Sequence, residues 1–249
     1  MKNIVIPGDD GRQRELRRRF GEFSDLSRAE AVILPLPSTV DEAFARKLRP
    51  DALVIGGRFD EKSRGLLDGH RVIDYTERAD FAQWNALATA EGALAILMDK
   101  LEITLDGAKI LVVGNGRIGK ILARKLKLLG AETAVSARKA ADLAEIETAG
   151  HFPLETAEIF RAASDFDAVV NTVPAPVLDR RFLEALRPGA FIVDLASAPG
   201  GTDFAAAKEL GVPALHALAL PGKTAPRSAA ETAYRSIRNI FSEVENHGT

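Results

Sequence analysis

A segment near the middle of the chain, residues 110–139, constrains the fold more than any other. An apolar run at residues 110–113 predicts a buried strand of a parallel sheet, and the glycine-rich sequence GNGRIG follows it directly. A helical pattern of apolar residues begins at once and ends at Gly130, after which residues 133–135 predict the next strand. Strand, glycine turn and helix in this order are the context that the dinucleotide-binding fingerprint GxGxxG requires.

Each glycine of such a turn has its own task. Gly114 allows a tight turn, Gly116 lets the backbone approach a pyrophosphate, and Gly119 allows helix and strand to pack closely. The helix N-terminus adds unpaired N–H groups and a positive dipole end. A bare GxGxxG is weak evidence, but this flanking pattern favours a phosphate-binding turn over an ordinary connection. The predicted cofactor contacts here are Gly114, Asn115, Gly116, Arg117, Ile118 and Gly119.

The end of the second strand distinguishes between cofactors. NAD-binding sites usually place Asp or Glu about twenty residues after the fingerprint, where it holds the ribose hydroxyls. This strand ends without an acid, in the sequence VSARK. A serine hydroxyl and two cationic side chains suit a 2′-phosphate, so we predict NADP bound by Ser136, Ala137, Arg138 and Lys139. The alternative is a solvated basic turn before a helix.

Composition permits this architecture and argues against several classes of partner. The 249 residues, 46% of them hydrophobic, can form two modest α/β domains with real cores. The net charge of −2 provides no field that would attract nucleic acid or an anionic membrane. The chain has no cysteine, which fits a reducing cytoplasm, and it lacks a signal-peptide pattern and a long apolar run. We therefore expect a cytoplasmic protein, and we predict no metal site.

Strands alternate with helices along the whole chain, which predicts parallel sheets. The first third carries apolar strand patterns at residues 3–6, 31–36, 52–55 and 71–73. We expect two Rossmann-like, doubly wound parallel-sheet domains with a cleft between them. Residues 1–95 would form a substrate domain and residues 96–225 the NADP-binding domain. A C-terminal helix within residues 226–249 would join the first domain.

The join between the domains contains several polar residues. Residues 85–89 have a loop-like pattern, and residues 90–101 predict a helix whose inward side chains are Leu94, Leu97, Met98 and Leu101. A helix crossing between domains would place Asn85, Thr89 and Glu91 at the mouth of the cleft. Helix capping explains the same residues equally well, because Thr and Glu are favoured at helix N-termini.

Ligands of parallel sheets bind at the carboxyl ends of the strands, and polar loops follow several strands of this chain. In the first domain these ends carry Arg12 and Ser38. In the second domain, three loops at residues 171–174, 194–203 and 218–226 are what a nicotinamide site needs. The first of them adds the predicted cofactor contacts Asn171, Thr172, Val173 and Pro174.

At these loops the sequence resembles the family formed by the A subunits of dipicolinate synthase. The segments that carry the resemblance occur in order along nearly the whole chain: GDDGRQ, ERADFAQWNALATAEGA, VGNGRIG, VSARK, NTVP, DLASAPGGTDF and ALPGKTAP. The resemblance implies the NADP-dependent oxidation of a dihydrodipicolinate, derived from 4-hydroxy-tetrahydrodipicolinate, to pyridine-2,6-dicarboxylate in endospore formers. It also implies a hetero-oligomer with a smaller, flavoprotein-like B subunit.

That chemistry requires a hydride acceptor, a base and groups that bind two carboxylates. Candidates for the carboxylates are cations, hydroxyls and backbone N–H groups at the strand ends or the cleft mouth. Glu91 and Asp194 are the candidate proton handlers, although Asp194 can instead orient Ser197 or cap the turn. Lys223 can instead pair with a surface acid. The full set is Arg12, Ser38, Asn85, Thr89, Glu91, Asp194, Ser197, Gly200, Gly201 and Lys223.

Two other functions remain open at this point. One is an NADP-dependent 2-hydroxy or amino acid dehydrogenase with the same two-domain plan, although its usual histidine constellation is hard to assemble from four histidines. His216, at the end of a strand, is more typical of a hydrogen-bonded structural residue than of a catalyst. The other is a non-catalytic, NADP-binding subunit that regulates a partner.

Overall fold

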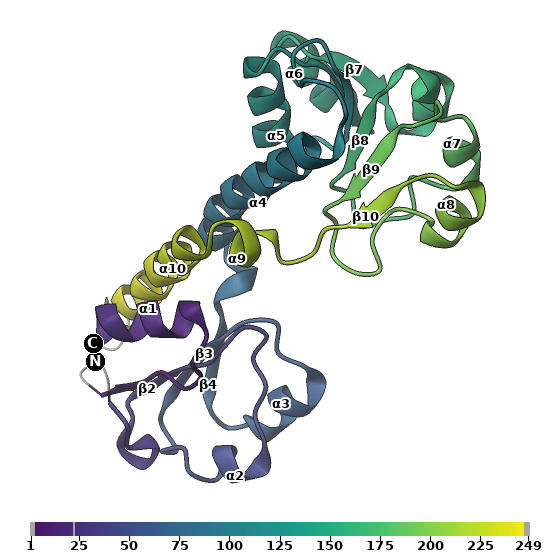
Figure 1. Ribbon diagram of the computed structural model, residues 1–249. Helices are drawn as coiled ribbons and strands as arrows, with labels where there is room; N and C mark the ends of the chain where they lie inside the picture. The colour runs from purple at the N-terminus through teal and green to yellow at the C-terminus, as the bar shows by residue number, and fades with distance from the viewer. Residues whose placement is uncertain (1–2, 22, 247–249) are drawn as a thin grey trace. The chain divides into compact units, whose positions relative to one another are not determined.

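The structure is a computed structural model that describes residues 3–21 and 23–246, so His247 of the polar tail lies outside the described residues. The chain forms two compact units, one of Met1–Asn85 with Ala225–Thr249 and the other of Ala86–Thr224 (Figure 1). Each unit contains one parallel sheet, so the predicted α/β class with two Rossmann-like domains is confirmed. Among the described helices, none combines the length and the apolar character needed to cross a membrane.

Unit 1 is built on four parallel strands in the order β1-β2-β3-β4. Alternate residues of these strands face opposite layers: Ile33 and Ile55 lie on one side of the sheet, Val32 and Val54 on the other. Both faces are therefore buried, which explains the short, continuous apolar runs of the sequence. The strands are β1 (Ile4–Val5), β2 (Ala31–Ile33), β3 (Leu53–Gly56) and β4 (Arg71–Asp74), and the helices α1 (Gly11–Phe20), η1 (Leu26–Arg28), α2 (Glu42–Ala45), α3 (Glu61–Leu66) and η2 (Tyr75–Glu77).

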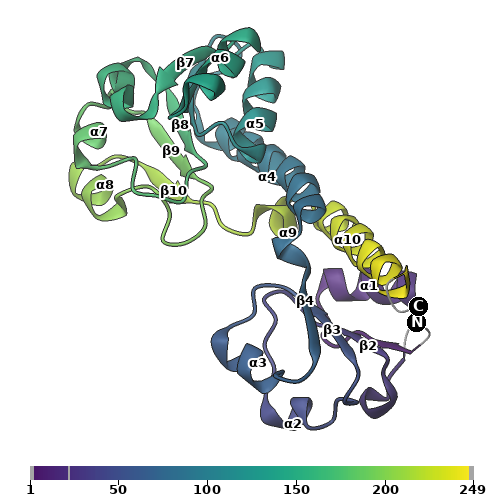
Figure 2. The ribbon, with the colours of Figure 1, turned by 180° about the vertical axis from the view of Figure 1, so that it is seen from behind.

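The C-terminal helix α10 (Pro226–Asn246) packs beside α1 in unit 1, as both ribbon views show (Figures 1 and 2). Its apolar face contributes Ile237, Ile240 and Phe241 to the core of that unit. Asp80 fixes the helix from outside the core, since its carboxylate accepts hydrogen bonds from Ser236 and Asn239. Partial burial alone would raise the pKa of Asp80, but these bonds and Arg78 lower it to about 2.

Unit 2 contains six parallel strands in the order β10-β9-β8-β5-β6-β7. The order reverses between β5 and β8, and such a switch point is where open parallel sheets bind their ligands. Helices cover both faces of the sheet. The strands are β5 (Lys109–Val113), β6 (Glu132–Ala137), β7 (Phe152–Glu155), β8 (Ala168–Asn171), β9 (Phe191–Asp194) and β10 (Ala214–His216). The helices are α5 (Arg117–Leu128), α6 (Ala140–Thr148), η3 (Thr156–Asp165), α7 (Arg180–Glu184), α8 (Phe204–Leu210) and α9 (Leu220–Thr224).

Helix α4 (Ala79–Lys100) corrects the prediction for the join between the domains. Residues 85–89 are helical rather than a loop, because the alanine-rich sequence has good helix propensity and no proline interrupts it. The helix buries Ala90, Ala93 and Leu97, while Met98 is 57% exposed although it was predicted to face inward. Met98 lies about 100° around the helix from Leu97, and this rotation takes it off the buried face.

The predicted loop at residues 218–226 is also partly wrong, because Leu220–Thr224 forms the short helix α9. Leu220 packs beside Gly92 of α4, where an added Cβ would lie 3.0 Å from the Leu220 Cβ. A tertiary contact thus orders a segment whose Pro, Gly and Lys content is typical of a loop. Strand β2 was predicted to cover residues 31–36 but ends at Ile33, because two prolines follow at positions 35 and 37.

Candidate functional site

The turn between β5 and α5 has the geometry that the fingerprint predicts. Gly114 has a φ of 101°, which favours glycine, and an added Cβ would lie 2.7 Å from both the Thr172 hydroxyl and the Val173 side chain. A Cβ at Gly119 would clash with the carbonyl oxygen of Gly114. Two of the three glycines are therefore required by the fold itself.

Gly116 differs from its two neighbours in the motif. A Cβ at this position would meet no atom of the described residues within 4 Å, so open space lies in front of the backbone. Helix α5 begins here without a side-chain cap, and its first intrahelical bond runs from the Lys120 N–H to the Gly116 oxygen. The preceding N–H groups, those of Arg117, Ile118 and Gly119, therefore point to the helix end. The residues present fit a bound pyrophosphate.

The loop after β8 lies against this turn and is held by its own side chains. The Thr172 hydroxyl donates to the Val113 oxygen at 2.8 Å, while Asn171 accepts from the Val173 N–H and donates to the Val173 oxygen, both at 3.0 Å. Asn171 is fully buried, and Pro174 is exposed. This loop therefore supports the fingerprint turn and presents Thr172 and Val173 beside Gly114.

Of the four residues predicted to contact a 2′-phosphate at the end of β6, two are buried and two are exposed. Ser136 is fully buried and its hydroxyl lies 3.4 Å from the Thr156 hydroxyl, so its side chain belongs to the interior of unit 2. Ala137 is buried as well. Arg138 and Lys139 are exposed and precede α6. The cations are available to an anion at this edge of the sheet, whereas the serine hydroxyl is not exposed to one.

Asp194, at the end of β9, organises the following loop rather than facing solvent. Its side chain is fully buried, and four donors from other residues reach its two oxygens at 2.7–3.0 Å. They are the Asn171 amide, the Ala196 and Gly201 N–H groups and the Thr202 hydroxyl. Of the roles predicted for Asp194, holding the turn is the one that this geometry supports.

The glycines of this loop pack against protein atoms. Gly200 has a φ of 92°, and its N–H donates to the Ser197 oxygen at 2.8 Å. A Cβ at Gly201 would lie 2.5 Å from the Ala175 oxygen. The N–H groups of Ala196, Gly200 and Gly201 are thus engaged within the loop. A side chain at Gly200 would strain the backbone, so the effect of such a substitution on activity would not measure substrate binding alone. The side chain of Ser197 is exposed and remains the candidate substrate contact here.

The candidates from the join lie on α4, and Lys223 of the third predicted loop lies on α9. The Glu91 carboxylate forms an ion pair with Lys125 of α5 at 2.9 Å, so the predicted proton handler has a cationic partner within unit 2. Thr89 is buried at 7% exposure, Asn85 is half-buried, and Lys223 is exposed on α9. At the end of β10, His216 forms a hydrogen bond of 2.9 Å with the Ala196 oxygen and stacks on Phe204, as expected for a structural histidine.

In unit 1 the two candidates at the sheet edge, Ser38 and Arg12, have different environments. The Ser38 hydroxyl is buried, donates to the Pro35 oxygen at 2.6 Å and accepts from the Gly57 N–H at 2.8 Å, so it joins two loops. Arg12 is half-buried and donates to the Tyr75 hydroxyl at 3.3 Å. Its Nε is buried and has no hydrogen-bond partner among the described residues. A buried guanidinium N–H without an acceptor suits an anionic ligand.

Two residues near these sites were missed by the sequence analysis. Tyr75 follows β4, and burial raises the pKa of its hydroxyl beside Arg12. Glu145 of α6 contacts both Lys120 and Asn115 of the fingerprint region. Both contacts join residues that lie far apart in the chain, so no local motif indicates them. The sequence signal that could have indicated Glu145 is its position on the helix after β6, seven residues after Arg138.

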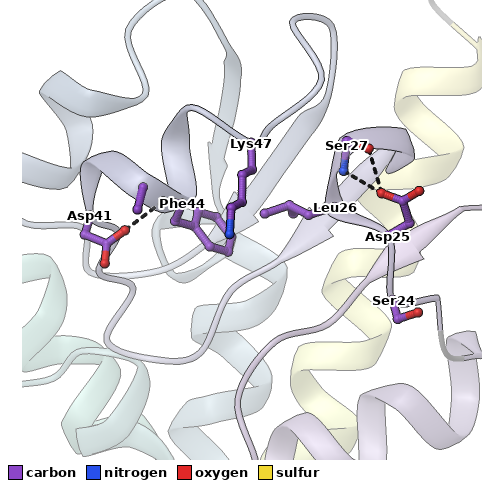
Figure 3. A pocket seen from close by; sticks show the side chains of 8 residues that line it. Ser24, Asp25, Leu26, Ser27, Asp41, Phe44 and Lys47 are labelled. Carbon is purple, nitrogen blue, oxygen red and sulfur yellow. Dashed lines mark hydrogen bonds between the residues drawn. The ribbon is translucent and has the colours of Figure 1, made fainter.

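A pocket of about 630 Å³ lies elsewhere in unit 1, between η1 and α2 (Figure 3). Leu26 and Phe44 form part of its lining, and Asp25 and Asp41 cap the two helices by accepting from the Ser27 and Phe44 N–H groups. None of the predicted site residues lines it. Both acids are thus engaged in capping.

Comparison with known proteins matches the fingerprint region to a dinucleotide-binding domain. The model of the D-isomer specific 2-hydroxyacid dehydrogenase, NAD binding domain, matches residues 79–206, about half of the chain. The A subunit of dipicolinate synthase from Bacillus subtilis (strain 168) is 35% identical over 175 residues, which cover 70% of this chain and 59% of that protein. The chain thus aligns with less than two thirds of this curated relative.

Two solved structures match over nearly their whole length. The A subunit of dipicolinate synthase from Bacillus halodurans is 28% identical with a TM-score of 0.91, covering 96% of this chain and 97% of that one. Its counterpart from Bacillus subtilis is 26% identical with a TM-score of 0.89, covering 98% and 97%. The predicted resemblance is confirmed, and these matches support an oxidoreductase that binds a nicotinamide dinucleotide.

Proposed function

The chain belongs to the D-isomer specific 2-hydroxyacid dehydrogenase NAD-binding family, and we propose that it is the A subunit of a dipicolinate synthase, oxidising a dihydrodipicolinate with NADP⁺. The observation that carries this proposal is the open fingerprint turn in a chain similar to known dipicolinate synthase A subunits. The carboxyl edge of the unit 2 sheet binds the dinucleotide. The setting that the resemblance implies is spore formation, in the cytoplasm.

The choice of NADP over NAD rests on the residues after β6. Position 137, where an acid would hold the ribose hydroxyls, is a buried alanine, and the exposed Arg138 and Lys139 follow. A guanidinium binds phosphate oxygens in a bidentate manner and an ammonium adds a point charge. NADP⁺, when bound, supplies the hydride acceptor.

The substrate class rests on Arg12. Its buried Nε lacks an acceptor among the described residues, and a carboxylate oxygen provides one. Tyr75 lies 3.3 Å from the guanidinium and limits its movement. A small dicarboxylate such as dihydrodipicolinate gives this cation one of its two carboxylates, and Ser197 offers a hydroxyl in unit 2.

The reaction balances without a further redox group. Loss of water from 4-hydroxy-tetrahydrodipicolinate gives the dihydro compound. One ring C–H bond then breaks with transfer of a hydride to the nicotinamide, and a neighbouring ring position releases a proton. The products are pyridine-2,6-dicarboxylate, NADPH and H⁺, and aromatisation favours them. Glu91 and Asp194, already engaged with Lys125 and the β9 loop, are held as structural groups rather than as the base.

We further propose that the chain acts with a B subunit of flavoprotein type, since a relative whose name designates it as one of several subunits implies a partner. Co-expression followed by size-exclusion chromatography should give a single complex. Two species that elute separately at micromolar concentration would contradict this part of the proposal.

The decisive experiment is product formation from enzymatically generated 4-hydroxy-tetrahydrodipicolinate, with the chain by itself, with its partner by itself and with both mixed. We expect equal amounts of pyridine-2,6-dicarboxylate and NADPH, and slower turnover with NAD⁺. Oxidation only in the mixture, with the chain still binding NADPH, would favour a non-catalytic role. No product in any combination, together with turnover of 2-hydroxy or amino acids, would replace the proposed substrate.

A further inference from the structure

A carboxylate from outside the fingerprint lies against it. Glu145 of α6 places one oxygen 2.8 Å from the Lys120 ammonium of α5, and the other 2.9 Å from the same nitrogen and 3.3 Å from the Asn115 amide. The Asn115 side chain belongs to the glycine turn itself. The end of β6 carries no acid, but an acid on the helix that begins after β6 lies against the glycine turn.

This location matters because of what the fold binds there. In a doubly wound sheet the adenosine ribose lies over the glycine turn, beside the end of the second strand, which here is β6. A 2′-phosphate on that ribose would be held by the exposed Arg138 and Lys139, at the start of α6. Glu145 belongs to α6 and contacts the turn through Asn115, so a phosphate bound beside α6 would experience its negative charge.

We propose that Glu145 is a specificity-determining residue that opposes the 2′-phosphate, and that Lys120 is the counter-charge that moderates this opposition. The inference rests on the proposed binding of NADP at the fingerprint turn. Glu145 holds Lys120 away from the phosphate, so removing the carboxylate both relieves a repulsion and frees a cation. NAD shares the pyrophosphate but carries a hydroxyl in place of the 2′-phosphate, so its binding depends little on either change.

The charges are placed so that the effect is measurable but limited. The side chains of Lys120 and Glu145 are 47% and 50% exposed, so water and salt screen them. An exposed ion pair of this kind contributes little to stability, so its loss leaves the fold intact. Any change in cofactor preference is therefore separable from a change in folding.

The test compares Glu145→Gln with Glu147→Gln, a matched substitution at an exposed acid on the same helix. Dissociation constants for NADPH and NADH are measured by fluorescence titration at low and at high salt, with thermal unfolding as a check on folding. We expect Glu145→Gln to bind NADPH about two- to fivefold more tightly at low salt, with NADH nearly unchanged and the gain reduced at high salt. Glu147→Gln should match the wild type.

A second variant tests the counter-charge. Lys120→Met should weaken NADPH binding by a similar factor and leave NADH binding nearly unchanged. The proposal is overturned if Glu145→Gln shifts both cofactors equally or neither, if Glu147→Gln has the same effect, or if the preference changes only because NADH binds less tightly. These outcomes concern the change in preference between variants. A wild-type protein that prefers NADH would instead contradict the proposed cofactor.

Discussion

Two loops at the carboxyl edge of the same sheet have opposite characters. The turn after β5 is open: among the described residues, no atom lies in front of Gly116 and no side chain caps the α5 N-terminus. The loop after β9 is closed: Asp194 accepts hydrogen bonds from two of its N–H groups and from Thr202. Both are rich in glycine and both follow buried strands. Glycine content at a strand end therefore does not reveal whether the backbone donors are available to a ligand.

The difference has a simple physical origin. A buried carboxylate collects donors until its charge is compensated, because leaving it unpaired in the interior costs several kcal/mol. Asp194 is such a group, and the loop folds around it. The β5 turn contains no acid, so its N–H groups and the helix dipole remain directed outward. One loop serves the fold and the other serves a ligand.

The largest effect should come from removing the centre of the closed loop. We expect Asp194→Ala to lower the free energy of unfolding by about 3–5 kcal/mol, because buried donors that lose their acceptor cost about 1–3 kcal/mol each. Urea unfolding measures it. The control is Asp203→Ala, which removes only the cap of α8 and should cost about 1 kcal/mol. Equal losses in the two variants would show that the loop is not organised by Asp194.

In the open turn, a methyl group should affect binding and spare the fold. Gly116→Ala places a Cβ in empty space, so we expect near wild-type stability and a loss of cofactor affinity of about 2–3 kcal/mol as the pyrophosphate is displaced. Gly65→Ala, at another open position in α3, should leave binding unchanged. If Gly116→Ala binds NADPH with wild-type affinity, the pyrophosphate does not bind at this turn.

A smaller effect should separate the two cofactors. Arg138→Ala should weaken NADPH by about 1–3 kcal/mol, the range for a lost charged hydrogen bond, and leave NADH nearly unchanged. The control is Arg124→Ala, which removes an exposed arginine from the body of α5. If the two cofactors lose affinity equally, Arg138 does not contact the 2′-phosphate, and the basic turn is merely solvated.

The smallest effect concerns the exposed hydroxyl of the closed loop. We expect Ser197→Ala to lower kcat/KM by a factor that corresponds to about 0.5–1.5 kcal/mol, one hydrogen bond to the substrate, with NADP(H) affinity unchanged. Ser164→Ala, at an exposed serine of η3, serves as the control. Wild-type kinetics for Ser197→Ala would leave Arg12 in unit 1 as the better candidate for substrate binding.

The sequence by itself determined the features that depend on neighbouring residues. Gly114, Gly116 and Gly119 act through a strand, a turn and a helix that follow one another directly, so their spacing specifies the geometry. The alternation of strands and helices likewise determined the two parallel sheets. The loop predicted at residues 85–89 was wrong, because the helix propensity of the surrounding alanines outweighs the loop-like pattern of those five residues.

Only the tertiary structure decided which polar groups are available. Asp194 meets Asn171, Glu145 meets Lys120, and Arg12 meets Tyr75 across 23, 25 and 63 residues of chain. Such pairs form where strands and helices remote in sequence become adjacent, and a carboxylate or hydroxyl pairs with whatever donor the fold brings to it. The sequence shows that a polar residue is present at a strand end. Its hydrogen-bond partners come from elsewhere in the chain, and they determine whether the residue can bind a ligand or stabilises the fold.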